Sequence, residues 1–205
     1  MIRNLIFDLG GVILNYDVEA DTKALAKAGL PEYSRWEEFP ELGEIANLYL
    51  NGLISDEEFC VRIDPFCAEG TSDSVKFNSM QAVLADIPRE RLEAIIALRG
   101  RYRIFLLSNI NHQSWEYALS QFGKAGIAPE ECFDGIFLSY ELGIAKPGAE
   151  VFKHVLEVTG SSPSETLFLD DSSDNIRAAQ ALGIETCKVP MNSPEEIIEE
   201  LTIKK

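Results

Sequence analysis

Short apolar runs that alternate with helical patterns are the feature that most limits the folds open to this chain. Phe, Ile, Leu and Val dominate the runs with little alternation, as in strands that are covered on both faces. Strands and helices that follow one another at short intervals are joined by right-handed crossovers, so the strands are expected to be parallel. This pattern predicts a doubly wound α/β sheet with five strands. They span Asn4–Phe7, Arg103–Leu107, Gly135–Leu138, Thr166–Leu169 and Glu185–Val189.

Helical patterns fill the connections in the second half of the chain. They cover Gln113–Lys124, Gly148–Thr159 and Asp174–Leu182, and the last of them ends at Gly183, a residue suited to a helix C-terminus. The run Ser193-Pro194-Glu195-Glu196 has the spacing of a capping box, with proline at the first helical position. It predicts a terminal helix.

Residues 15–88 break this alternation, because they carry helical patterns and no convincing strand. We interpret them as an α-helical cap domain inserted into a Rossmann-like core domain of residues 1–14 and 89–205. Ligands of open α/β sheets bind beyond the carboxyl ends of the strands, and the segment leaves the core at that place. The expected cap helices are Val18–Gly29, Pro40–Leu50, one that begins after Ser55, and Asp73–Asp86. Trp36 and Glu41–Asn51 are possible lining residues, although core packing is the favoured role of Trp36, Leu42, Leu48 and Leu50.

Composition excludes several classes of partner. The chain has 205 residues, of which 46% are hydrophobic, and a net charge of −16, which argues against nucleic acid or an anionic membrane surface. No apolar stretch approaches the roughly 18 residues of a membrane helix, and no signal peptide is visible, so a cytoplasmic location is expected. The four cysteines lack metal-ligand spacing and are expected to be thiols. The chain is expected to be a monomer or a homodimer.

Polar residues follow four of the predicted strands. The carboxyl ends of parallel strands lie at one edge of a sheet, so these side chains are expected to face a common crevice. The set combines acidic groups, small hydrogen-bonding groups and one cation. Its members are Asp8, Ser108, Asn109, Lys146, Asp170 and Asp171.

Such a set suits phosphoryl transfer. An aspartate carboxylate can attack phosphorus and form an aspartyl phosphate, and a divalent ion between the two anions lowers their repulsion. Mg²⁺ prefers carboxylate and carbonyl oxygens. Asp8 and Asp171, with Asp170 beside them and the carbonyl of Gly10, are therefore the candidate metal ligands.

The same edge offers groups for the phosphate. The hydroxyl of Ser108, the amide of Asn109 and backbone N–H groups such as that of Gly11 are candidate phosphate contacts. The ammonium group of Lys146 would offset negative charge on both the phosphate and Asp8. Asp8 and Lys146 are thus the candidate catalytic residues.

With these motifs in place, the chain resembles the haloacid dehalogenase-like hydrolase superfamily, in its α-helical-cap group. The resemblance covers roughly residues 2–189. The branch of sugar phosphatases typified by bacterial α-D-glucose-1-phosphate phosphatase is the most similar. The resemblance implies Asp8 as the nucleophile, Lys146 as the charge-stabilising residue and Asp171 as a metal ligand. The four matching motifs are Asp8-Leu9-Gly10-Gly11-Val12, Leu107-Ser108-Asn109, Lys146-Pro147, and Phe168-Leu169-Asp170-Asp171 with Asn175.

One position departs from the superfamily pattern. Most of its phosphatases carry a second aspartate two residues after the nucleophile as the general acid and base, and here that position is Gly10. The sugar-phosphatase branch is similar in carrying glycine there. Candidate replacements are Asp17, Asn15 and the cap residue Glu44, and His112 is a further candidate for substrate contact.

The leading hypothesis is a Mg²⁺-dependent phosphatase that acts on a small phosphorylated metabolite, with a sugar phosphate favoured. One alternative is a 2-haloacid dehalogenase, which needs neither the second aspartate nor a metal, although the pair Asp170-Asp171 would repel a carboxylate substrate. The other alternative is a noncatalytic module that binds phosphorylated ligands, which the glycine at position 10 keeps open.

Overall fold

The computed structural model describes residues 1–32, 35 and 38–203, and Trp36 lies outside these ranges. Its centre is a sheet of five strands in the order β3-β2-β1-β4-β5, and every pair of neighbours is parallel. This confirms the predicted fold class. The strands are β1 (Asn4–Phe7), β2 (Arg103–Ser108), β3 (Gly135–Leu138), β4 (Thr166–Asp170) and β5 (Glu185–Lys188).

The strand register brings the functional segments together. Phe7 of β1 pairs with Leu106 of β2 on one side and with Leu169 of β4 on the other. The residue after β1 is therefore flanked by the ends of both neighbouring strands, and the N–H of Asp8 donates to the carbonyl of Leu169 at 2.9 Å. From β1 the chain builds the sheet first outward through β2 and β3 on one side and then through β4 and β5 on the other. Open α/β sheets bind ligands at the strand ends where this change of side occurs.

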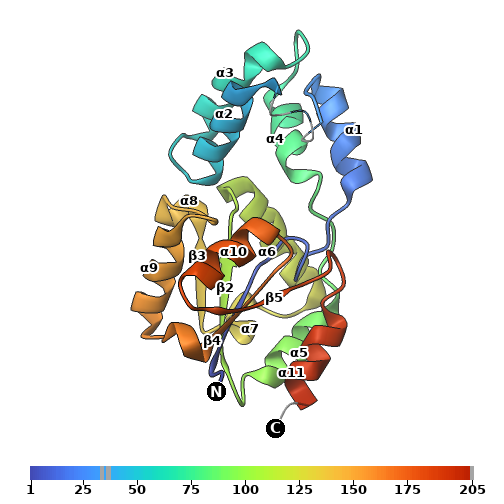
Figure 1. The fold of residues 1–205 in the computed structure, drawn as a ribbon. Coiled ribbons are helices and arrows are strands. Elements are labelled where there is room, and N and C mark those ends of the chain that lie inside the picture. The colour runs from blue at the N-terminus through green and yellow to red at the C-terminus, as the bar shows by residue number, and fades with distance from the viewer. Residues whose placement is uncertain (33–34, 36–37, 204–205) are drawn as a thin grey trace.

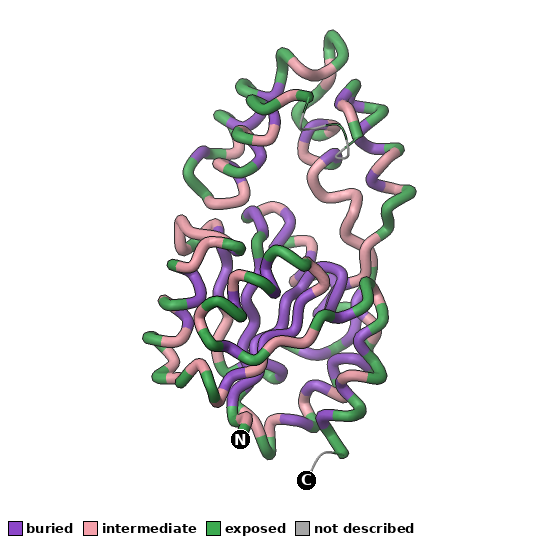
Figure 2. The backbone as a smooth tube through the Cα atoms, in the orientation of Figure 1, coloured by how far each residue is buried: buried purple, intermediate pink, exposed green. Residues whose placement is uncertain are grey.

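Helices cover both faces of the sheet, as Figure 1 shows. On one face, α5 (Arg89–Leu98), α6 (His112–Ala125), α7 (Pro129–Cys132) and α11 (Glu195–Ile203) pack around Phe7, Leu106 and Leu169. On the other face, α9 (Ala149–Thr159) and α10 (Ser173–Ala181) pack on Ile6, Leu107 and Phe168. The three central strands β1, β2 and β4 are almost fully buried (Figure 2), which explains why their sequences do not alternate, whereas the edge strand β5 has no buried residue. The shorter elements of the described residues are α8 (Ser139–Leu142) and the 3-10 helix η3 (Pro163–Glu165) in the core, and the 3-10 helix η2 (Asp64–Phe66) in the cap segment.

The helix boundaries follow from local capping. Helix α6 begins at His112, one residue before the prediction, because the side chain of Asn111 accepts a hydrogen bond from Ser114 N at 2.8 Å. Helix α11 begins at Glu195 rather than at the predicted proline. The carboxylate of Glu195 is bonded to Arg91 at 2.6 Å, so it is engaged in a long-range ion pair.

Helices α1 (Val18–Ala28), α2 (Pro40–Leu50), α3 (Asp56–Ile63) and α4 (Asp73–Gln81) lie together at one end of the molecule, away from both termini (Figure 1). They share an apolar cluster of their own around Leu25, Leu42 and Phe59. The assignment of residues 15–88 to a separate cap domain remains a prediction. None of the described helices is long and apolar enough to cross a membrane. The four cysteines form no disulfide among the described residues.

Helix α4 ends earlier than predicted, because the chain after it pairs with the other connection between cap and core. Asp17 N donates to the carbonyl of Val83 at 2.7 Å, Ala85 N to that of Asn15 at 2.8 Å and Asn15 N to that of Asp86 at 2.9 Å. The two segments that connect cap and core, residues 15–17 and 83–86, are therefore hydrogen-bonded to each other.

Candidate active site

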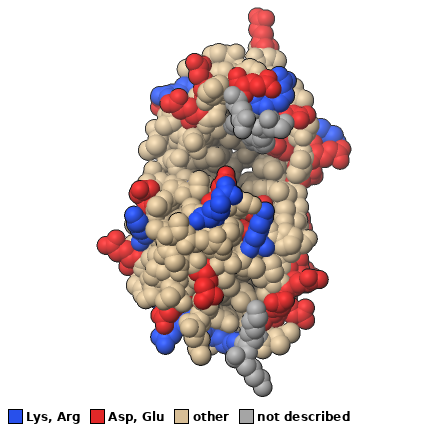
Figure 3. Space-filling model, viewed as in Figure 1, with Lys and Arg blue, Asp and Glu red and all other residues tan. Residues whose placement is uncertain are grey.

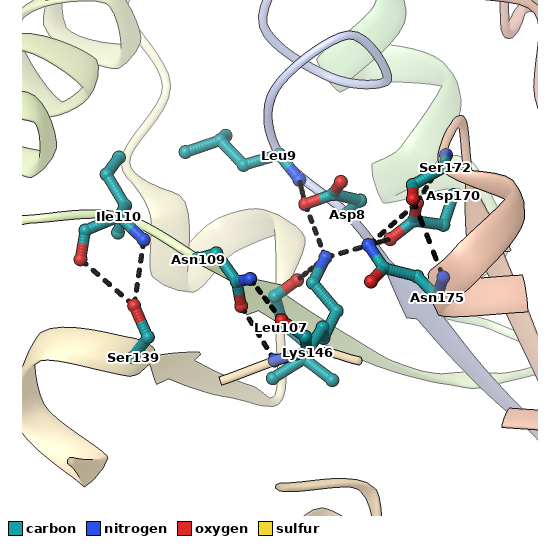
Figure 4. Close-up of polar contacts among 10 residues, drawn as sticks. All are labelled: Asp8, Leu9, Leu107, Asn109, Ile110, Ser139, Lys146, Asp170, Ser172 and Asn175. Carbon is teal, nitrogen blue, oxygen red and sulfur yellow. Dashed lines mark hydrogen bonds and ion pairs between the residues drawn. The ribbon is translucent and has the colours of Figure 1, made fainter. Parts of the chain in front are cut away.

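Lys146 is the centre of the site, and Figure 4 shows its contacts. Its Nζ lies 2.7 Å from Oδ1 of Asp8 and 2.9 Å from Oδ2 of Asp170, and it donates to the carbonyl of Leu107 at 2.9 Å. The side chain is 1% exposed. Burial acts to lower the pKa of Lys146, but the two carboxylates outweigh it, so the pKa lies above its usual range. The ammonium group is therefore charged and has three acceptors for its three protons.

Asp170 fixes the position of this cation. Its Oδ1 accepts from Ser172 N at 2.7 Å and from Asn175 Nδ2 at 3.1 Å. Its Oδ2 accepts from Lys146 and, at 3.0 Å, from Asn175. A fully buried carboxylate with this many donors is committed to the protein, so Asp170 is suited to hold Lys146 rather than to reach a ligand.

Asp8 presents the candidate nucleophilic carboxylate. Its Oδ1 accepts from Leu9 N at 2.7 Å as well as from Lys146. Burial raises the pKa of the Asp8 carboxyl to about 7, with Lys146 acting to lower it and Asp170 to raise it further. Two fixed donors on one oxygen set the orientation of the carboxylate.

A group of acidic side chains lies around Asp8. Carboxylate oxygens of Asp8, Asp170 and Asp171 all fall within 4.8 Å of one another. Burial, and then the charge of Asp170, raise the pKa of Asp171 above its usual range. The crowding of the three carboxylates and the raised pKa values of Asp8 and Asp171 fit a divalent cation, which would lower the mutual repulsion. The donor set thus suits Mg²⁺.

Gly11 makes room for Asp171. A Cβ atom at Gly11 would lie 2.6 Å from Oδ2 of Asp171, and the φ angle of Gly11 is +71°, a value that favours glycine. The N–H of Gly11 donates to the carbonyl of Leu14 at 2.8 Å. In this structure the N–H is engaged in the turn after β1, and its contact with phosphate remains a prediction.

Ser108 is the last residue of β2 and Asn109 follows it, but the two side chains differ in what they contact. Ser108 is buried at the floor of the cavity. Both ends of the Asn109 amide engage Lys146: its Nδ2 donates to the Lys146 carbonyl at 2.6 Å and its Oδ1 accepts from the Lys146 N–H at 2.9 Å. Asn109 therefore holds the lysine loop, and its contact with phosphate remains a prediction.

The candidate replacements for an acid at position 10 lie elsewhere. Asp17 caps helix α1 by accepting from Ala20 N at 2.9 Å. Asn15 Oδ1 accepts from the buried guanidinium of Arg91 at 2.9 Å. Glu44 is exposed and does not line the cavity described below, and neither does His112, which is exposed at the start of α6.

Two residues that shape the site, Ser139 and Tyr16, were not identified from sequence. Ser139 directly follows β3, and its Oγ donates to the carbonyl of Leu50 at 2.5 Å and accepts from Ile110 N at 2.9 Å, so it ties helix α2 to the core. It carries the same signal as Ser108, a polar residue at the end of an apolar strand. Tyr16, which lines the cavity, gave no such signal.

A cavity of about 480 Å³ lies between the cap helices and the strand ends. Figure 3 shows the molecule hollowed at this level, with basic side chains beside the opening. Leu9 and Gly10, which follow Asp8, and Ser108 and Asn109 form its core side. The cap side is mostly apolar, with Asn47 and the hydroxyl of Tyr16 as its polar groups among the described lining residues; the rest are Gly43, Ala46, Leu50, Met80, Val83 and Leu84.

Known proteins are similar to this chain in sequence and in fold. The chain is 32% identical over 188 residues to D-ribitol-5-phosphate phosphatase of Bacteroides thetaiotaomicron, covering 91% of each chain. It is 27% identical to the sesquiterpene phosphatase AstK of Aspergillus oryzae, over 87% of this chain and 85% of that one.

Crystal structures of one haloacid dehalogenase (HAD) family enzyme from B. thetaiotaomicron also match. One has a TM-score of 0.87 and 33% identity, covering 100% of this chain and 99% of that chain. The wild-type enzyme in complex with magnesium and inorganic phosphate has a TM-score of 0.82 and 36% identity, covering 94% of this chain and 96% of that chain.

A model of the haloacid dehalogenase-like hydrolase family matches residues 2–183, which include all of β1 to β4 and the polar residues that follow them. This chain therefore belongs to the haloacid dehalogenase-like hydrolase family.

Proposed function

We propose that this protein is a Mg²⁺-dependent phosphomonoesterase that hydrolyses a small phosphorylated metabolite through an aspartyl phosphate on Asp8. The observation that carries the proposal is the buried Lys146, which contacts Asp8 at 2.7 Å and Asp170 at 2.9 Å beside the carboxylate of Asp171. A fixed cation next to an oriented carboxylate suits attack on an anion.

The residues divide the work as follows. Asp8 attacks phosphorus, the P–O bond to the alcohol breaks, and the electron pair stays on the alcohol oxygen, which takes a proton from water. A second water then attacks the phosphorus of the aspartyl phosphate, so that inorganic phosphate leaves and the Asp8 carboxylate is restored. Lys146 offsets the charge that gathers beside Asp8 in both steps.

Asp8, Asp171 and the carbonyl of Gly10 would hold the metal ion. When bound, Mg²⁺ supplies charge neutralisation between the carboxylate and the phosphate. The similar B. thetaiotaomicron enzyme, whose structure contains magnesium and inorganic phosphate, supports this assignment. Asp170 is left as the partner of Lys146, because its oxygens are already engaged.

A sugar or polyol phosphate is the substrate class that we favour, and the similarity to D-ribitol-5-phosphate phosphatase supports it. The apolar cap side of the cavity favours a second candidate, a phosphate ester of an apolar alcohol. The similarity to a sesquiterpene phosphatase agrees with that candidate. The two classes differ in what they require of the cap, since buried hydroxyl groups need hydrogen-bond partners and an alkyl chain does not.

The test is phosphate release from p-nitrophenyl phosphate, D-ribitol 5-phosphate and a prenyl monophosphate, with Mg²⁺ and with EDTA. We expect Mg²⁺-dependent turnover that Asp8→Asn abolishes. Asp174→Asn, which changes an exposed aspartate paired with Arg177, is the matched control and should keep wild-type activity. Unchanged turnover in Asp8→Asn would refute the proposal.

Two further outcomes would identify the alternatives. Metal-independent halide release from 2-chloropropionate would indicate a dehalogenase. Thermal stabilisation by phosphate esters without turnover of any of them would indicate a binding module.

A further inference from the structure

Gly10 and Tyr16 are complementary in shape. A Cβ atom at Gly10 would lie 2.1 Å from the hydroxyl oxygen of Tyr16 and 2.5 Å from its Cζ. The backbone of Gly10 lies outside the left-handed region, so its conformation does not require glycine. Space is the reason for glycine here: the phenol of Tyr16 occupies the volume into which a side chain at position 10 would project.

The backbone of Tyr16 is held from a distant part of the chain. Its N–H donates to Asn192 Oδ1 at 2.7 Å, and its carbonyl accepts from Asn192 Nδ2 at 3.0 Å. Asn192 N donates in turn to the carbonyl of Gly11 at 2.7 Å, and Arg91 donates to the Asn192 carbonyl at 3.2 Å. The ring therefore stands on a fixed base beside the turn that follows Asp8.

The cavity has few groups that could act on the departing part of a substrate. No acid, imidazole or amine is among its described lining residues. Both the oxygen and the nitrogen of the Asn109 side-chain amide are hydrogen-bonded to the backbone of Lys146. Ser108 lies at the floor of the cavity, where it is expected to contact the phosphate rather than the leaving group. Tyr16 supplies an O–H donor beside Gly10, the residue two positions after the nucleophile.

We propose that the Tyr16 hydroxyl donates a hydrogen bond to the ester oxygen of the substrate and so stabilises the leaving group. The inference rests on the proposed phosphatase function of the Asp8 site. As the P–O bond breaks, its electron pair gathers on that oxygen, and a donor already in place gains strength with the charge. The ring also fills the space beside Gly10 and keeps water out of it. The proton that completes the alcohol comes from water, as in the steps described above.

The test compares two leaving groups in Tyr16→Phe, a variant that keeps the ring packed on Gly10. p-Nitrophenolate is a weak base and leaves without a hydrogen-bond donor, whereas the ribitol alkoxide that leaves from D-ribitol 5-phosphate is a strong base. Loss of one such donor is expected to lower kcat/KM about 10²-fold for the alkyl ester. For p-nitrophenyl phosphate the decrease is expected to stay below about threefold, as Brønsted behaviour requires. kcat/KM is the right measure because it includes the departure of the first product.

Tyr102→Phe is the matched control. Tyr102 also carries one hydroxyl in a hydrogen bond, to the carbonyl of Leu201 at 3.5 Å, on the far side of the core. It should be unchanged with both esters, and thermal unfolding of both variants checks that they are folded. Equal decreases with the two esters in Tyr16→Phe, or no decrease with either, would overturn the inference. Neither result affects the proposed function, which fails separately if Asp8→Asn keeps its activity.

Discussion

Replacing Lys146 with methionine tests how charge is balanced in the site. The substitution keeps most of the length of the side chain and removes its ammonium group. Asp8 and Asp170 then lose the cation that lies 2.7 and 2.9 Å from their oxygens, and both carboxylates are almost fully buried. Two buried acidic groups would be left facing each other without compensation.

The structure sets the size of both effects. Removing one partner of a buried ion pair costs about 3–5 kcal/mol in the free energy of unfolding. Burial already raises the pKa of Asp8 to about 7, and Lys146 is the strongest influence that lowers it, so the pKa rises further in the variant. A protonated carboxyl is not a nucleophile. The acidic limb of the kcat/KM profile should therefore move to higher pH, and kcat/KM at neutral pH should fall by at least about 10².

Urea unfolding without metal gives the stability change, and phosphate release from p-nitrophenyl phosphate across pH with Mg²⁺ gives the profile. Lys76→Met is the control. Lys76 is also a buried lysine that bridges two aspartates, with Nζ 2.5 Å from Asp64 and 3.3 Å from Asp73, but it lies on the cap helix α4. The Lys76→Met variant should be less stable than the wild type, and the acidic limb of its kcat/KM–pH profile should stay at the wild-type pH. An acidic limb at the wild-type pH in Lys146→Met would refute the reasoning, whatever the change in stability.

Two further substitutions test single groups. Asp171→Asn should weaken the thermal stabilisation by Mg²⁺ alone, because it removes one of the crowded carboxylates, and the exposed Asp174→Asn should not; equal stabilisation in the two variants would argue against Asp171 as a ligand. Asp21 is buried in α1, and burial raises its pKa from 3.8 to about 6. The folded state therefore keeps a proton that the unfolded chain has lost, so stability falls as pH rises from about 4 to about 6. Asp21→Asn should reduce that fall by about 1–2 kcal/mol in urea unfolding, and an identical pH dependence in both proteins would contradict the reasoning.

The sheet was predictable because its information is local. Strands β1 to β4 are largely apolar runs of four to six residues, and the structure differs from the predicted boundaries by at most one residue at the carboxyl ends of β2, β4 and β5. Helix α4 shows the limit of local information. Its sequence continues a helical pattern to Asp86, but hydrogen bonds to residues 15–17 end the helix at Gln81.

The composition of the site was predictable for a related reason. A residue that follows a strand is carried to the same edge as its counterparts, so Asp8, Ser108 and Asp170 had to lie near one another once the sheet was parallel. The signal also covered Ser139, which holds the cap helix α2. It could not say which group faces which.

Sequence alone thus determined that acidic and basic groups would meet at one edge of a parallel sheet, because strand direction fixes where a chain segment ends. Tertiary structure decided the partners. Asn109 turned to the lysine loop, Gly11 made room for a carboxylate, and the ring of Tyr16 came to rest on Gly10 through a contact with Asn192, 176 positions away. Such contacts depend on how loops from separate strands approach one another in space, and no local pattern of residues encodes how close two distant loops will come.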